Sequence, residues 1–274
     1  MRIRLKARAF EKLRGTENSV LSMPDLLSKA AGYFVNPYSH NQEAAEILRL
    51  AMDRKPDNSM AVAMMGFCRH RMLEFSSFDP AEDVKDELLG YPEKAVSLDP
   101  SSYFAHVMAA VMYQDLRGDY ETALTHAETA LELNSSFGLA RAVVGICKCH
   151  LGEIDEGLEM LRRVAAASPE DPHRFRHFRE LAIAHFMAGQ DAQALRVVNR
   201  LVHQAPELAR NRLVLASLSW HAGRQEAARD CVAGLLRDQP DVTLQNMRPV
   251  RFVDPDMVER YAQGLRDAGL PEGA

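Results

Sequence analysis

Residues 118–123 read Gly-Asp-Tyr-Glu-Thr-Ala, and the layout of this stretch returns at regular distances along the chain. A glycine ends one predicted helix, the next helix starts within a few residues, and small residues recur on one face of that second helix. The same layout is found at Gly152, Gly189 and Gly223, at successive spacings of 34, 37 and 34 residues. Because self-similarity at this period is typical of arrays of helix hairpins, we expect an all-α solenoid.

The period predicts about six antiparallel hairpins between residues 22 and 241, preceded by a leading segment, 1–21. The first hairpin pairs helices 22–35 and 42–54. The regular units that follow Pro100 pair 102–116 with 120–133, 137–150 with 154–167, 173–187 with 191–203, and 207–221 with 225–237. Pro169, Pro206 and Pro240 close three of these units at the same phase, as expected for a residue that cannot continue a helix.

The second hairpin, residues 59–98, is irregular. Its first helix is followed by an insert, Ser76–Pro80, and its second contains Gly90-Tyr91-Pro92. Because proline lacks a backbone donor and clashes with the preceding turn of a helix, we expect two helical pieces, 81–89 and 92–98. Insertions in solenoids generally lie on one exposed face.

Residues 242–274 form the expected C-terminal cap. Asp254-Pro255-Asp256 has the composition of a helix start, and Gly269 and Pro271 mark the end of the helix. The apolar residues on one face of this helix are Met257, Val258, Tyr261 and Leu265. Since an open array leaves an apolar end that must be covered, we expect this helix to cap the last repeat.

Composition narrows the class of protein. The formal net charge of −5 argues against a polyanion-binding protein, and no apolar run approaches the length of a membrane span. The basic first residues lack the apolar core of a secretory signal, so we expect a cytoplasmic protein and reduced thiols. The cysteines, which show no disulfide-framework spacing, are Cys68, Cys147, Cys149 and Cys231.

The 34-residue unit resembles the tetratricopeptide repeat (TPR). That repeat has a small residue at its eighth position, alanines near its twentieth and twenty-seventh, and a proline near its thirty-second. The matching residues are Gly145 and Pro169 in the unit of Gly152, Ala182, Ala194 and Pro206 in the unit of Gly189, and Ala216, Ala228 and Pro240 in the unit of Gly223. Val111 and Ser135 depart from the pattern. The resemblance implies a right-handed superhelix of hairpins, in which small residues let the two helices cross closely.

A narrower resemblance concerns the arrangement of the whole chain. The irregular second hairpin, the segment Phe252-Val253-Asp254-Pro255 and the ending Leu265–Glu272 are similar to the array that follows class III adenylate or guanylate cyclase domains, or winged-helix domains, in a bacterial group. The chain resembles the regulatory half of these proteins without the output half. The resemblance therefore implies a regulatory role beside a cyclase-like partner, and no cyclase activity.

Catalytic, cofactor and metal sites are not expected. No glycine-rich phosphate loop, nucleophile elbow or His-Glu-x-x-His motif occurs. Cys147, Cys149 and His150 point to different sides of one helix, so they do not converge on an ion. The cationic and aromatic stretch 173–179 could contact a phosphate backbone, but the negative net charge favours a solvated helix face with inward phenylalanines. We expect no enzyme, no cofactor and no nucleic-acid partner.

The resemblance also implies a binding surface, because positions 2, 5, 9 and 12 of each first helix line the concave groove of such arrays. The relatives that clamp a free carboxyl terminus carry lysine and asparagine at positions 5 and 9, which these units lack. The predicted partner-binding residues are Met108, Met112, Arg176, Arg179, Phe186, Arg210 and Trp220. A partly apolar surface with arginines at one end suits an acidic or amphipathic peptide or partner domain. Two alternatives stay open: apolar residues that only pack against neighbouring helices, and a small-ligand sensor.

Overall fold

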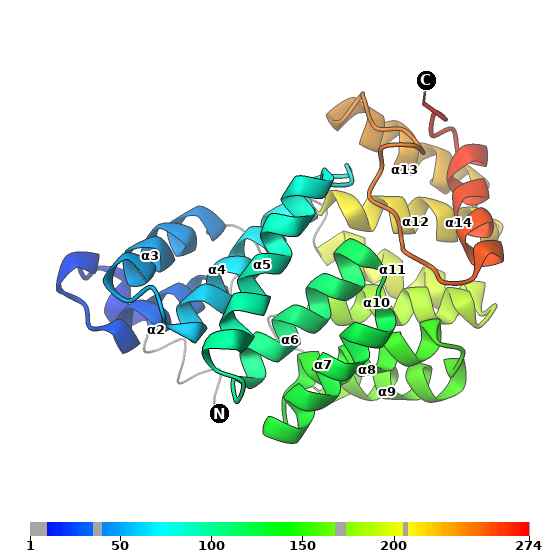
Figure 1. Ribbon diagram of the computed structural model, residues 1–274. Coiled ribbons are helices and arrows are strands. Elements are labelled where there is room, and N and C mark those ends of the chain that lie inside the picture. Colours follow the sequence, from blue (N-terminus) through cyan, green and yellow to red (C-terminus); the bar gives the residue numbers. More distant parts are fainter. Residues whose placement is uncertain (1–9, 35–39, 168–173, 205–207, 274) are drawn as a thin grey trace.

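A computed structural model of the chain describes residues 10–34, 40–167, 174–204 and 208–273. Figure 1 shows helices stacked side by side along a curved array. Pro169 and Pro206, His173 and residues 1–9 of the leading segment lie outside the described residues. The fold prediction is confirmed: the chain is an all-α, right-handed superhelical TPR solenoid of antiparallel hairpins.

The hairpins follow the predicted ranges, with small shifts at their ends. Helices in each pair are α2 (Met23–Tyr33) with α3 (Asn41–Arg54), α4 (Ser59–Met72) with α5 (Glu82–Leu98), α6 (Tyr103–Met112) with α7 (Tyr120–Leu133), α8 (Gly138–His150) with α9 (Ile154–Ala167), α10 (Arg174–Met187) with α11 (Asp191–Gln204), and α12 (Ala209–His221) with α13 (Gln225–Asp238). Short helical turns extend two first helices: a 3₁₀ turn η2 (Leu73–Phe75) and a π-helical turn η3 (Tyr113–Arg117).

Small residues hold the helices of a hairpin at short distance, as the repeat pattern predicts. A Cβ atom at Gly157 would lie 2.3 Å from the carbonyl oxygen of Gly145, so α8 and α9 cross with their backbones in contact. The repeat glycines also end their helices in the left-handed region, with φ of 66° at Gly118 and 98° at Gly152. Glycine adopts this conformation without strain. The regular spacing of these glycines therefore has a structural cause: the turn between the two helices of the hairpin needs a residue with a positive φ.

The predicted break in the second hairpin is wrong. Helix α5 runs without interruption through Pro92, whose side chain is buried. Leu88, Leu89 and Ala95 pack inward on both sides of the proline. Burial of these residues outweighs the single hydrogen bond that proline removes, because packing of an apolar face supplies most of the stability of a helix in a protein.

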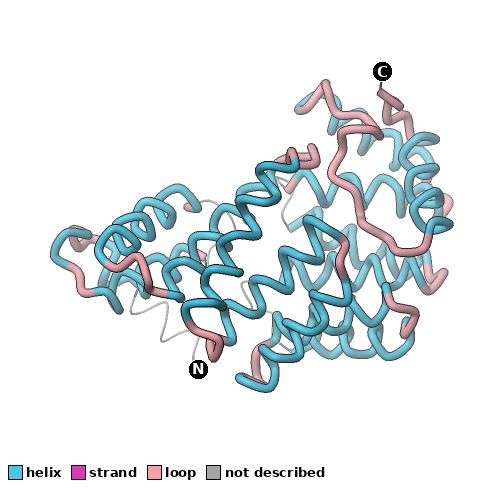
Figure 2. The backbone as a smooth tube through the Cα atoms, viewed as in Figure 1, coloured by secondary structure: helices cyan, strands magenta, loops and turns pink. Residues whose placement is uncertain are grey.

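The first helices of the hairpins form an inner layer. α4, α6, α8, α10 and α12 each pack against the next first helix as well as against their own partner. We call the side of these helices that carries positions 2, 5, 9 and 12 the inner face. The segment 241–254, which we call the strap, has no helix and crosses between α13 and the last helix; Figure 2 shows it as a long loop.

The last helix, α14 (Pro255–Asp267), packs against α12. Its start is as expected, since the Asp254 side chain accepts a hydrogen bond from the amide of Asp256 at 2.9 Å. A Cβ atom at Gly264 would lie 2.8 Å from the Ser217 hydroxyl, which is on the inner face. Helix α14 therefore covers the inner side of the last repeat. Val258, predicted on its packed face, is 45% exposed.

Candidate functional site

The strap is fastened to the insert of the second hairpin, far away in sequence. The Arg248 amide donates to the Ser77 carbonyl at 2.5 Å, and the Asp79 amide donates to the Asn246 carbonyl at 2.9 Å. These bonds continue an isolated antiparallel bridge between Phe78 and Met247. The insert therefore does not project into solvent as an exposed loop; it closes the array onto its C-terminal segment.

Two strap side chains extend this contact toward the inner face. The Arg251 guanidinium donates to both carboxylate oxygens of Asp79, at 2.8 and 2.9 Å. The Phe252 ring is buried, with its centroid 6.1 Å from that of Phe186 and 5.8 Å from that of Tyr261. The strap thus binds as an extended segment that is anchored by one arginine and one aromatic ring.

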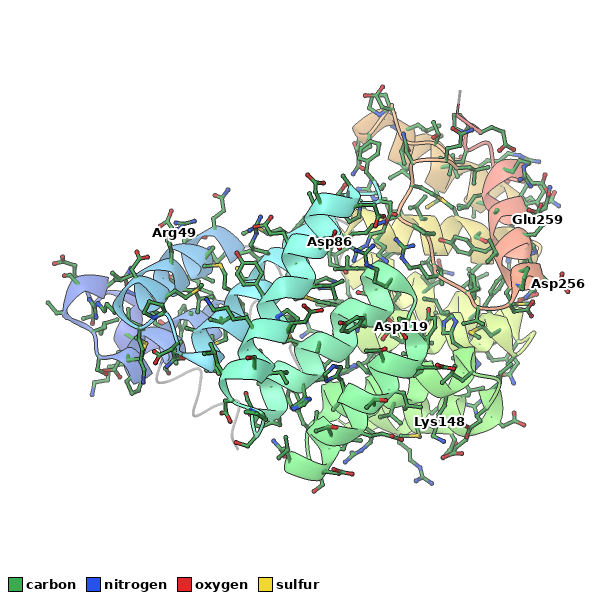
Figure 3. All side chains as sticks on the ribbon, viewed as in Figure 1. Arg49, Asp86, Asp119, Lys148, Asp256 and Glu259 are labelled. Atoms are coloured by element: carbon green, nitrogen blue, oxygen red, sulfur yellow. The ribbon has the colours of Figure 1, made fainter. Side chains whose placement is uncertain are left out.

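A buried ionic cluster lies beneath the strap. It comprises Glu74 of η2, Asp115 of η3, Arg176, Arg179 and Glu180 of α10, Arg210 of α12, Arg248 of the strap and His70 of α4. Each of these residues is less than a tenth exposed. The strap, and the approach of η2 to α12, bring together elements that repeat stacking alone would leave apart. Figure 3 shows the contrast with labelled charged residues such as Arg49, Asp86 and Glu259, which point outward.

The two carboxylates at the centre of the cluster are shared by the four arginines. Arg176 donates to both oxygens of Asp115, at 2.7 and 3.3 Å, and Arg179 pairs with Glu74. Arg210 Nη1 lies 3.2 Å from Asp115 Oδ2 and 3.6 Å from Glu74 Oε1. Arg248 Nη1 lies 3.7 Å from Glu74 Oε1, and its Nη2 lies 3.7 Å from Asp115 Oδ2. The cluster therefore connects α10, α12 and the strap to the ends of α4 and α6.

Charge and burial oppose each other in this cluster. Burial alone would raise the pKa of Glu74, but the charges of Arg179, Arg248 and Arg210 lower it well below its usual range. Burial lowers the pKa of His70, so its imidazole is neutral at pH 7. Burial, together with the charge of Arg210, lowers the pKa of Arg248 to about 10, which still leaves the guanidinium protonated.

His70, Glu74 and Asp115 also have the residue types of a metal site. One ligand atom from each lies within 4.8 Å of the others. Each of the four arginines makes two contacts within 4 Å of the oxygens of Glu74 and Asp115, and a divalent cation would be repelled by all of them. The arrangement favours negative, not positive, charge at this place.

The seven residues predicted from the sequence fall into separate environments. Met108 and Met112 are fully buried between helices, Met112 beside Leu88, Leu89 and Leu116. Arg176, Arg179 and Arg210 come together in the buried ionic cluster.

Phe186 and Trp220 lie farther along the array. Phe186 is fully buried between the strap's Phe252 and the guanidinium of Arg260, whose carbon lies 4.1 Å from its centroid. Trp220 is half-buried, with Arg229 5.2 Å over its ring. The chain's own C-terminal segment reaches two of these places, where Arg248 shares Asp115 with Arg210 and where Phe252 and Arg260 lie against Phe186.

Sequence reasoning missed Glu74, Glu180 and the whole strap. Glu74 lies at the end of the first helix of the second hairpin, and the 34-residue pattern assigns no inner position to that place. Arg248 lies in a non-repetitive connector. The available signal was the connector's composition, because Arg248, Arg251 and Phe252 are unusual in a solvated linker between a repeat and its cap.

Comparisons with known proteins address the fold. Models of protein families give no match to the sequence, and a search of curated proteins gives none. No helix in the described ranges combines the length and apolar character that a membrane crossing requires.

Solved structures do resemble the chain. The Cut9–Hcn1 complex of the APC/C matches with a TM-score of 0.65 and 13% identity, over 97% of this chain and 47% of that one. TTC0263, a TPR protein of Thermus thermophilus, matches with 0.52 and 16%, over 72% and 98%. Human IFIT1, solved with the capped RNA m7Gppp-AAAA, matches with 0.63 and 16%, over 79% and 50%. At these identities the likeness concerns the fold alone: the chain shares the TPR solenoid.

Proposed function

We propose that this protein is a non-catalytic interaction module whose inner face binds an extended segment of a partner protein. The observation that supports the proposal most directly is the strap. The insert holds the chain's own extended strap through backbone hydrogen bonds and the Arg251–Asp79 pair, and the inner face holds it through the buried ring of Phe252 beside Phe186. These are the contacts by which peptide-binding proteins generally hold extended ligands.

The strap also indicates the chemistry of the partner. Arg176, Arg179 and Arg210, which suggested an acidic peptide, are buried beside Asp115 and Glu74 and do not face a peptide at the surface. The strap instead brings arginines to carboxylates, Arg251 to Asp79 and Arg248 to the cluster. We therefore propose a partner segment with arginine followed by an aromatic residue, in place of the acidic peptide.

Other roles have less support. The arginines of the inner face are less than a tenth exposed, which argues against their contacting a nucleic-acid backbone in this conformation. The cyclase-associated regulatory role stays a prediction from the sequence, as does a cytoplasmic location.

A peptide in trans tests the proposal. The strap competes with any partner from within the same chain, where its effective concentration is high. We expect a fluorescent peptide of residues 245–254 to bind the full chain carrying Arg251→Ala and Phe252→Ala at least about tenfold more tightly than the wild type, because the double change weakens the strap. Fluorescence anisotropy measures the Kd.

Two controls make the result specific. Val253→Ala changes an exposed strap residue and should leave the Kd as in the wild type. A peptide with both arginines replaced by glutamate should not bind. Equal affinity of the double variant and the wild type for the strap peptide would contradict the proposal.

A further inference from the structure

The buried ionic cluster carries more positive than negative charge. Its cations are Arg176, Arg179, Arg210 and Arg248, and its anions are Glu74, Asp115 and Glu180. His70 adds no compensating charge, since its imidazole is neutral. Among the described residues of the cluster, the arginines therefore outnumber the carboxylates by one, and an uncompensated buried charge is strongly unfavourable.

The same cluster has surplus hydrogen-bond donors, concentrated on two arginines. Nε and Nη1 of Arg210, and Nε and Nη1 of Arg248, donate no hydrogen bond to any described residue. Arg210 is 5% exposed and Arg248 is 1% exposed, so bulk water does not satisfy these groups. The amide nitrogen of the Asn211 side chain, next to Arg210 on α12, also has no acceptor among the described residues. Buried donors in proteins are normally paired.

These two guanidinium groups are neighbours, although they come from different elements. Arg210 Nη1 and Arg248 Nη1 lie 3.6 and 3.7 Å from the same atom, Glu74 Oε1. Both groups also lie within 4 Å of Asp115 Oδ2. The carboxylates on this side are already shared among several cations, so these donors of both arginines have no hydrogen-bond acceptor among the described residues.

We propose that a small phosphate-type oxyanion binds between Arg210 of α12 and Arg248 of the strap. Such an anion supplies the missing negative charge and several acceptor oxygens at once. The planar guanidinium fork is suited to phosphate oxygens, to which it donates two parallel hydrogen bonds. A divalent cation fails on both counts, because it would add positive charge and accept no hydrogen bond.

The position of the site gives the anion a structural consequence. Arg248 belongs to the strap and Arg210 to the last repeat, so the bound anion ties the strap to the inner face. The anion therefore stabilises the closed array, and it opposes any partner that binds where the strap lies. The site is independent of the peptide proposed above, because anion binding is measured without a partner.

Direct binding to the full chain tests the site. Equilibrium dialysis with radiolabelled inorganic phosphate should give one bound phosphate per chain. Thermal unfolding in phosphate, against chloride at equal ionic strength, should show a Tm rise of roughly 5 °C when phosphate is 100-fold above its Kd. Phosphoserine as a second ligand separates free phosphate from a phosphate group on a larger molecule: the buried site predicts that free phosphate binds more tightly.

Matched variants assign the effect to the two arginines. Arg248→Met removes the surplus charge and the free donors, so it should lose both the bound phosphate and the Tm rise. Arg163→Met, at an exposed arginine of α9 that pairs with Glu159, should keep both. Arg210→Met decides the question if Arg248→Met does not fold. A wild-type chain that binds no phosphate, or methionine variants at 248 and 210 that bind it like the wild type, would overturn the proposal.

Discussion

The first hairpin and the C-terminal half of the molecule use the same repeat but satisfy their charged groups differently. In the first hairpin, Lys29 donates to the carbonyl of Thr16, 13 residues away, and Arg54 donates to that of Leu21, 33 residues away. In the buried ionic cluster, Arg176 reaches Asp115 across 61 residues, and Arg179 reaches Glu74 across 105. The charged groups of the first hairpin find partners at shorter sequence separation, whereas those of the cluster find partners in distant repeats.

The difference shows what the strap adds to a solenoid. In an open array each repeat contacts only the adjacent ones, so stability is nearly a sum of local terms. Here the strap and the insert make contacts between residues more than 160 positions apart, such as the Arg248 amide with the Ser77 carbonyl (248−77 = 171). We call the part of the array from the insert to α14 the closed half. It should unfold as one unit, and changes in the cluster should affect more than one repeat.

The largest expected effect comes from Glu74→Gln. This change leaves four arginines opposite two carboxylates, and removing one partner of a buried ion network generally costs about 3–5 kcal/mol. Urea unfolding should show this loss in the free energy of unfolding. The matched control is Glu87→Gln, whose carboxylate is 48% exposed and pairs with Arg69 at the surface; it should cost about 0–1 kcal/mol. Equal losses of unfolding free energy at the two positions would mean that the buried ionic cluster contributes no more to stability than a surface ion pair.

The repeat half of this comparison was predictable from the sequence. Helix ends, repeat glycines and the close crossing at Gly145 depend on signals that are local or periodic, and the structure confirms them. The position of Pro92 inside α5 was not predictable from a local rule, because buried neighbours on both sides decide it.

Closure was beyond the reach of the periodic pattern. The pairing of Ser77 and Asp79 with strap residues joins positions 171 and 167 residues apart (248−77 and 246−79) and follows no 34-residue period. The inner positions of Arg176 and Arg210 could be predicted, but not that Glu74 and Asp115 would neutralise them. The sequence thus indicates which side of the array is inner, and only the folded chain shows what covers it.

A pH-dependent effect of intermediate size is expected at His150, where the strap meets α8. Its ring stacks on Tyr120 with centroids 3.9 Å apart and lies 5.6 Å from that of Phe252. Burial lowers the pKa of His150 to about 3. The unfolded chain, with a histidine pKa near 6.5, then binds more protons than the folded chain between these values, so stability falls as pH drops below about 6.5.

His150→Gln should remove this part of the pH dependence. Between pH 7.5 and pH 5, the variant should lose about 2 kcal/mol less free energy of unfolding than the wild type, since each pH unit below 6.5 contributes about 1.4 kcal/mol. Denaturant unfolding at both pH values measures the difference. Glu74 and Asp115 do not interfere, because their lowered pKa values place their contribution at more acidic pH. Parallel pH profiles for the two proteins would show that His150 is not buried in its neutral form.

The smallest effect tests whether local terms are the same in both regions. The Asn58 side chain caps α4 by accepting from the Ala61 amide at 2.8 Å, and the Asp119 side chain caps α7 by accepting from the Thr122 amide at 3.0 Å. Asn58→Ala and Asp119→Ala should each cost about 1 kcal/mol, the usual loss for a helix N-cap. Thermal unfolding and hydrogen exchange of the capped helices measure both. The two costs should agree, because a cap bonds only its own helix. A much larger cost at Asp119, beside the closed half, would mean that closure also governs the local helix ends.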